Sequence, residues 1–141
     1  MSAIALATSD AELAACFPVM AQLRPHLTLE GFLSCVRRQQ ADGFQLAALT
    51  AAGVVVAVAG FRVLENLAWG RFLYVDDLVT DEARRSHGHG EELFDWLVAR
   101  ARAAGCHQLH LDSGVQRFGA HRFYLARRMD ITCHHFAMKL A

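Results

Sequence analysis

A segment of seven residues, Arg84 to Gly90, brings arginine, histidine and glycine together between a predicted strand and a predicted helix. At such a junction the first N–H groups of the helix have no partner within the helix, and the positive end of the helix dipole lies behind them. Gly88 and Gly90 carry no Cβ, so a pyrophosphate can approach the backbone closely, and Arg85 can add a charge-assisted contact. The segment predicts an anion-binding loop, although two glycines and an arginine also occur in ordinary turns.

The elements that must position this loop follow from the hydrophobic pattern. Ser9 and Glu12 have capping-box spacing for a first helix, and Gly105 marks the end of a helix that begins near Glu91. Strands are predicted at residues 4–7, 44–50, 54–63, 71–80, 108–112 and 131–140, and helices at residues 10–24, 28–42, 91–104 and 121–128. The strands ending at Thr80 and beginning at Gln108 are joined by a helix, so we expect them to be parallel neighbours, whereas the earlier hairpins are antiparallel. The sequence predicts an α/β (α+β) fold, in the order β-α-α-β-β-β-α-β-α-β.

Composition limits the classes of function. The chain has 141 residues, which predicts one domain spanning residues 1–141. Its 14 basic and 14 acidic residues balance, which argues against a nucleic-acid-binding footprint and against a polybasic membrane anchor. No run of 18 apolar residues is present, and four widely spaced cysteines fit a reduced compartment, so we expect a cytoplasmic protein without a membrane segment.

The loop and its flanks resemble a known family. The stretch from Leu78 to Gly90 resembles the acyl-CoA-binding segment of GNAT superfamily N-acetyltransferases, which has the pattern R/Q-x-x-G-x-G/A after a strand. Family members often carry N-x-x-A-x-x-(L/F)-Y-x-x-x-G-F further along. The residues at those offsets here are Arg117, Ala120, Phe123, Tyr124, Arg128 and Met129. The chain departs from the family pattern at Arg117, Arg128 and Met129, and upstream at Thr80, Glu82 and Ser86, where valine, proline and glycine are usual.

This resemblance implies a fold and a cofactor site. It implies a mixed, mostly antiparallel sheet of six to seven strands flanked by about four helices. Acetyl-CoA would be the co-substrate, with no metal. The main chain of Leu78, Val79 and Thr80 would pair with the pantetheine arm. The pyrophosphate would lie on the amides of the loop, namely those of Arg85, Ser86, His87, Gly88, His89, Gly90 and Glu91.

The resemblance also implies catalytic roles. Tyr124 would be the general acid, because a phenol of pKa about 10 is protonated at neutral pH and can donate to a thiolate of pKa about 8.5. The N–H of Val79 would stabilise the oxyanion. Asp112 is one candidate base, and Asp76 or Asp77 is another, with water as a further alternative. Because successive strand residues face opposite ways, we expect only one of Asp76 and Asp77 to face the cleft, apart from the other carboxylate.

The sequence thus predicts an N-acetyltransferase that moves an acetyl group to a primary amine of a small molecule or of a peptide by direct attack in a ternary complex. The alternative is a non-catalytic acyl-CoA-binding module with a regulatory or sensing role. Many GNAT proteins dimerise through terminal strands, so a homodimer is also an expectation. We expect no metal site at the adjacent His134 and His135, which would face opposite sides of a strand.

Overall fold

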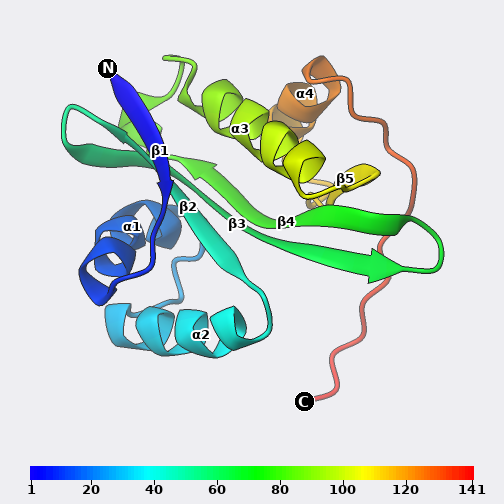
Figure 1. The fold of residues 1–141 in the computed structure, drawn as a ribbon, viewed down its shortest axis with the longest axis horizontal. Coiled ribbons are helices and arrows are strands. Elements are labelled where there is room, and N and C mark those ends of the chain that lie inside the picture. Colours follow the sequence, from blue (N-terminus) through cyan, green and yellow to red (C-terminus); the bar gives the residue numbers. More distant parts are fainter. The chain divides into compact units, whose positions relative to one another are not determined.

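The computed structural model describes residues 1–141, which form two compact units, Met1–His110 and Leu111–Ala141. The first unit is built around a sheet whose strands occur in space in the order in which they occur in the chain (Figure 1). The strands are β1 (Ser2–Leu6), β2 (Gln45–Ala51), β3 (Val54–Asn66), β4 (Gly70–Thr80) and β5 (Gln108–Leu111). The pairs β2–β3 and β3–β4 are antiparallel, as the sequence predicted, and β1 also pairs antiparallel with β2.

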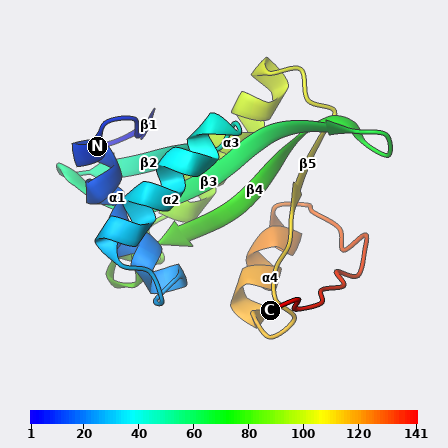
Figure 2. The same cartoon turned by 90° about the horizontal axis from the view of Figure 1, so that it is seen from below.

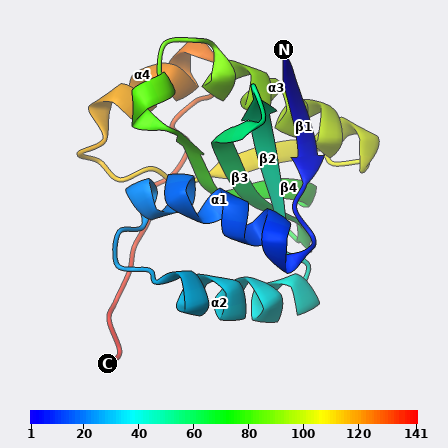
Figure 3. The same ribbon diagram turned by 90° about the vertical axis from the view of Figure 1, so that its left-hand side faces the viewer.

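Helices cover both faces of the sheet. The helices α1 (Asp10–Leu23) and α2 (Leu29–Ala41) lie on one face, and α3 (His89–Ala103) lies on the other (Figure 3). The first face buries a cluster that includes Leu13 and Phe32 against Leu46 and Val58 of the sheet. On the α3 face, Phe61 meets the ring of Trp96 edge-on, with 5.9 Å between ring centroids. Burial on both faces accounts for the long apolar run in β3.

The start of α1 agrees with its predicted capping box, and α2 begins one residue after the predicted residue 28. The Ser9 hydroxyl accepts a hydrogen bond from the N–H of Glu12, and the Glu12 carboxylate accepts one from the N–H of Ser9, which completes the capping box. Thr28 caps α2 through a bond from the N–H of Gly31 at 3.1 Å. These local signals fixed the first residues of both helices because capping depends only on neighbouring residues.

The strands β4 and β5 start together and run parallel. The N–H of His107, just before β5, donates to the carbonyl of Arg71 near the start of β4 at 2.7 Å. Figure 2 shows the two strands diverging from this shared start. The two strands begin at the same level, but β5 has only four residues. It therefore ends well before β4 reaches Thr80.

The second unit contains α4 (Phe118–Ala126). Its bounds overlap those of the helix predicted at residues 121–128 but are shifted by two to three residues towards the N-terminus. The strand predicted at residues 131–140 is wrong, because this segment has no regular secondary structure and all of its residues are exposed. A strand needs a neighbour for its backbone hydrogen bonds, and the apolar alternation of Phe136, Met138 and Leu140 does not supply one. The sheet therefore has five strands and not the six to seven expected. No helix is both long and apolar enough to cross a membrane.

Candidate active site

The loop after β4 has the backbone expected of an anion site. A short 3-10 turn, Glu82–Arg84, follows β4, and Gly88 is the N-cap of α3 with a φ of 79°. The first bond of the helix runs from the N–H of Glu92 to the carbonyl of Gly88 at 3.0 Å, so the helix does not use the N–H groups of His89 and Gly90. These amides lie at the positive end of the α3 dipole.

Ser86 is one of the departures from the family pattern, and its backbone conformation shows why glycine is usual at this position. Its φ is 68°, in the left-handed region that favours glycine. The backbone conformation at this position thus favours the usual glycine, and Ser86 adopts it at a cost of about 1 kcal/mol. The loop keeps its shape in spite of the substitution.

The charged side chains of the loop are largely exposed and make few contacts within the protein. Arg85 and His87 are exposed, whereas Arg84 is half-buried. The Nδ1 atom of His87 lies 3.1 Å from the carbonyl oxygen of Arg84, and the rings of His87 and His89 are 5.9 Å apart. Arg84, Arg85, His87 and His89 therefore all belong to the short stretch of chain that leads into α3.

A contact that the sequence did not reveal ties α1 to this loop. The side chain of Gln22 donates to the carboxylate of Asp81 at 3.1 Å and accepts from the N–H of Glu82 at 2.9 Å. Asp81 also accepts a bond from the N–H of Ala83, and these bonds hold the pKa of its carboxyl below the usual range. Gln22 was missed because no local pattern links it to a residue about sixty positions away.

The last residues of β4 have only one neighbouring strand. Leu78, Val79 and Thr80 lie opposite Ala59, Val58 and Ala57 of β3. On their other side β5 has already ended, so that edge of β4 has no strand partner in the first unit. Val79 is buried in the core, and its N–H and carbonyl face β3, because the N–H of Asp81, two residues further on, donates to Val56 of β3 at 2.8 Å. The expectation that the N–H of Val79 meets the oxyanion is therefore wrong, and the main-chain groups of Leu78 and Thr80 face the open edge. An extended chain can add to such an edge through backbone hydrogen bonds.

A β-bulge immediately precedes these residues and corrects one expectation. Asp77 lies opposite Gly60, but Val75 lies opposite Phe61, so Asp76 is an extra residue in β4. Both carboxylates consequently contact arginines on the face covered by α1 and α2. The prediction that strand alternation separates Asp76 from Asp77 is wrong, because it assumed an unbroken register.

Asp76 is fully engaged by Arg62 of β3. The Arg62 Nε and Nη2 atoms lie 3.1 and 2.7 Å from the two carboxylate oxygens of Asp76. Arg62 also donates to the Gln39 side chain at 2.6 Å and lies over the ring of Phe44, 5.3 Å from its centroid. This pair is about one-fifth exposed, and its geometry makes it a positioning pair at the bulge.

Asp77 is held more loosely by Arg24, which follows the last residue of α1. Both contacts, from Nε at 2.9 Å and from Nη2 at 2.7 Å, go to the same oxygen, Oδ1. Burial raises the pKa of Asp77, while Arg24 acts in the opposite direction. Arg24, Arg62 and Gln39 were not predicted as site residues, and only the bulge brings their partners to one face.

The second unit carries the other two candidates for catalysis. Asp112 follows β5, and its Oδ1 lies 3.3 Å from Nδ1 of His135. Tyr124 lies in α4, with its ring edge-on to Phe123 at 5.5 Å. Burial raises the pKa of Tyr124. The phenol therefore stays protonated over the whole neutral range.

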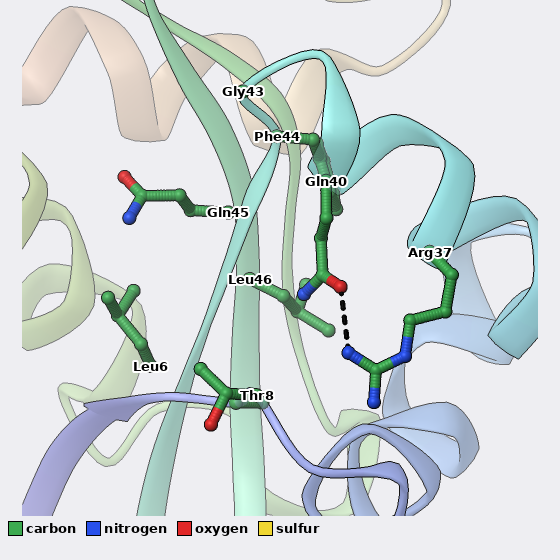
Figure 4. A pocket seen from close by; sticks show the side chains of 9 residues that line it. Leu6, Thr8, Arg37, Gln40, Gly43, Phe44, Gln45 and Leu46 are labelled. Atoms are coloured by element: carbon green, nitrogen blue, oxygen red, sulfur yellow. Dashed lines mark hydrogen bonds between the residues drawn. The ribbon is translucent and has the colours of Figure 1, made fainter.

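Elsewhere in the fold, the side chains that could bind a metal are dispersed, and an open hollow is present. No group of three or more histidine, cysteine, aspartate or glutamate side chains is arranged to hold a metal ion. An open hollow of about 480 Å³ lies between the end of β1, the start of β2 and the end of α2 (Figure 4). It is lined by Leu6, Ala7, Thr8, Arg37, Gln40, Gly43, Phe44, Gln45 and Leu46, none of which was predicted as a site residue.

Comparison with known proteins identifies the family to which the chain belongs. Residues 10–129 match the acetyltransferase (GNAT) family. The chain therefore belongs to the GNAT family of acetyltransferases and is an enzyme of that class. Among its relatives is an uncharacterized N-acetyltransferase of Bacillus subtilis (strain 168), YhdJ, which is 37% identical over 121 residues, covering 83% of each chain.

Solved structures share the fold at low identity. An aminoglycoside N-acetyltransferase, AAC(6')-Iy, in complex with CoA aligns with a TM-score of 0.85 and 16% identity, over 100% of this chain and 97% of that one. A glucosamine-6-phosphate N-acetyltransferase of Arabidopsis thaliana aligns with a TM-score of 0.78 and 17% identity, over 100% and 99% of the two chains. At these identities the similarity establishes the α+β GNAT fold.

Proposed function

We propose that the chain, as one domain of residues 1–141, transfers the acetyl group of acetyl-CoA to a primary amine of a small molecule or peptide. The observation that carries this proposal is the junction of β4 and α3, where an open strand edge leads into a loop with unused helix amides. GNAT membership and a CoA-bound structure of the same fold support acetyl-CoA as the co-substrate.

In this proposal the cofactor follows β4 into the loop. Leu78 and Thr80 offer main-chain groups to the pantetheine amides, as an added strand would use them, because the alternation of an antiparallel pair turns these two residues to the open edge. The amides from Arg85 to Glu91 receive the pyrophosphate at the positive end of α3. Arg84 and Arg85 add charge-assisted contacts to the phosphate oxygens.

The chemistry requires three groups besides the two substrates. The neutral amine attacks the thioester carbon, a C–N bond forms, and an N–H on the open edge of β4, that of Leu78 or Thr80, stabilises the oxyanion. When the C–S bond breaks, Tyr124 donates its proton to the leaving thiolate. The proton that the amine loses passes to a carboxylate, directly or through water.

We propose Asp77 as that carboxylate, with Asp112 as the alternative. Asp77 directly precedes the open edge of β4, its side chain is 16% exposed, and burial makes it more basic than an ordinary aspartate. Asp112 is half-exposed and faces His135. A base must be ionised to act, so kcat/KM should fall as the pH drops through the pKa of the free enzyme's base.

Titration with acetyl-CoA by calorimetry, followed by release of free thiol with a panel of amines, tests the function. Tyr124→Phe should lower kcat by about 100-fold or more and leave acetyl-CoA affinity within about twofold. Tyr74→Phe, at the only other tyrosine, is the matched control. Asp77→Asn and Asp112→Asn, compared side by side, identify the base.

The outcomes of these experiments distinguish the proposed function from its alternative. Failure to bind acetyl-CoA would overturn the proposal. Binding without turnover of any amine would favour the non-catalytic acyl-CoA-binding alternative. Unchanged turnover in Tyr124→Phe would remove that residue from the mechanism.

A further inference from the structure

The two arginine–aspartate pairs at the bulge differ in how much of their bonding capacity they use. The pair Arg62–Asp76 is closed, because both carboxylate oxygens accept from Arg62 and the guanidinium is also bound by Gln39. Its two side chains are 22% and 23% exposed. Neither carboxylate oxygen is left for a ligand, and the Arg62 guanidinium is mostly buried.

The pair Arg24–Asp77 is open. Nε donates to Oδ1 of Asp77 at 2.9 Å, and Nη2, on the same edge of the guanidinium, lies 2.7 Å from that oxygen. Nη2 makes a further contact with the carbonyl of Asp76 at 3.5 Å, and Nη1 makes no hydrogen bond. The two N–H groups of Nη1 thus remain available for an anionic partner such as a carboxylate or a phosphate.

The carboxylate of this pair is open as well. Oδ2 of Asp77 accepts no hydrogen bond, and it faces Gly60, where a Cβ would lie 3.2 Å away. Arg24 is 46% exposed and Asp77 16% exposed, so the cation lies on the solvent side of the anion. An ordered, half-exposed guanidinium fixed by a buried carboxylate is a preorganised receptor for an anion.

The charges of Arg24, Arg62, Asp76 and Asp77 sum to zero. Because this cluster has no net negative charge, a polycation gains no more electrostatic binding energy from it than a singly charged amine does. An acceptor with charges of both signs, in contrast, finds a partner for each. Its two groups must be close together because their partners belong to one ion pair.

We propose that the acceptor carries an anionic group, a carboxylate or a phosphate, next to its amine, with Arg24 binding the anion and Asp77 the amine. This inference rests on the proposed function, since it assumes that acetyl transfer takes place beside Asp77. It assigns Arg24 as the residue that determines specificity for the acceptor.

Matched acceptors test the inference. A pool of free amino acids is compared with the pool of their carboxamides, and phosphoethanolamine is compared with ethanolamine. In the wild-type enzyme, kcat/KM for the better anionic acceptor should exceed that for its uncharged partner by about 10- to 100-fold, as loss of one charge-assisted contact implies. The two pairs of acceptors distinguish a carboxylate from a phosphate.

The variant Arg24→Gln should abolish most of this preference. Because removing Arg24 also alters Asp77, the informative quantity is the ratio of kcat/KM between the two members of a pair and not the rate itself. That ratio should fall to within about threefold of unity in Arg24→Gln. It should stay at the wild-type value in Arg38→Gln, since Arg38 is an exposed residue of α2 bonded only to Ser34.

Other outcomes separate the two hypotheses. If acetyl-CoA binds and uncharged amines or polyamines are acetylated as well as the anionic acceptors, the inference fails and the proposed function stands. If acetyl-CoA binds and neither member of any pair is acetylated, the inference also fails. Loss of acetyl-CoA binding itself would instead overturn the proposed function.

Discussion

Gly60 of β3 is the residue at which a single added carbon tests the packing around the bulge. A Cβ at this position would lie 2.6 Å from Cζ and 2.7 Å from Cε1 of Phe44, and 3.2 Å from Oδ2 of Asp77. The Phe44 ring is only 5% exposed and has little room to move. We therefore expect Gly60→Ala to displace the ring and to destabilise the protein.

The size of the effect follows from two opposing terms. Forcing an extra carbon into a packed core costs about 1 to 3 kcal/mol. Replacing glycine by alanine inside a strand returns about 0.5 to 1 kcal/mol. Because two contacts would be shorter than any real Cβ contact, the steric term should prevail, with a net loss of about 1 to 2 kcal/mol.

Urea unfolding measures this loss, and a double-mutant cycle assigns its cause. In a Phe44→Leu background the obstructing ring is gone, so adding Gly60→Ala should cost less than about 0.5 kcal/mol or should stabilise the protein. The reasoning is refuted if Gly60→Ala alone is as stable as the wild type. It is equally refuted if the cost is the same with and without the Phe44 ring.

Three further predictions concern the loop, a helix cap and the cysteines. Ser86→Gly should relieve the left-handed strain and raise the free energy of unfolding by up to about 1 kcal/mol in urea, and a loss of stability would contradict the strain. The Glu12 carboxylate accepts bonds from the backbone of Ser9 and other groups, which lower its pKa to about 2. The stability it contributes should be complete above pH 4.5 and lost as the pH falls towards 2, so thermal melts of wild type and Glu12→Gln should converge at low pH. Burial raises the pKa of Cys16 to about 12, and Cys133 is exposed, so iodoacetamide at pH 8 should label Cys133 quickly and Cys16 only after unfolding, as mass spectrometry would show.

The loop between β4 and α3 could be located from the sequence because its signals are local. Glycines at 88 and 90, an arginine before them and an amphipathic helix after them are all contained in a short stretch. The positive φ of Gly88 and the unused amides agree with that interpretation. Ser86, which departs from the family pattern, still adopts the conformation that a glycine would.

The predicted strand at residues 131–140 failed for a physical reason. Its alternating pattern describes a chain that can form a strand, but a strand exists only where a neighbour provides hydrogen bonds. Such a partner is a property of the tertiary structure. A helix such as α1, in contrast, makes its backbone bonds within itself, so its start at Asp10 could be predicted from Ser9 and Glu12.

By itself, the sequence determined the family, the position of the loop between β4 and α3 and the general order of helices and strands, because each depends on residues close together in the chain. Only the tertiary structure decided the arrangement around Asp77. The β-bulge turns Asp76 and Asp77 to one face, and Arg24 and Arg62 reach them from 53 and 14 residues away. Register and long-range ion pairing depend on how whole strands align, and no local pattern encodes that alignment.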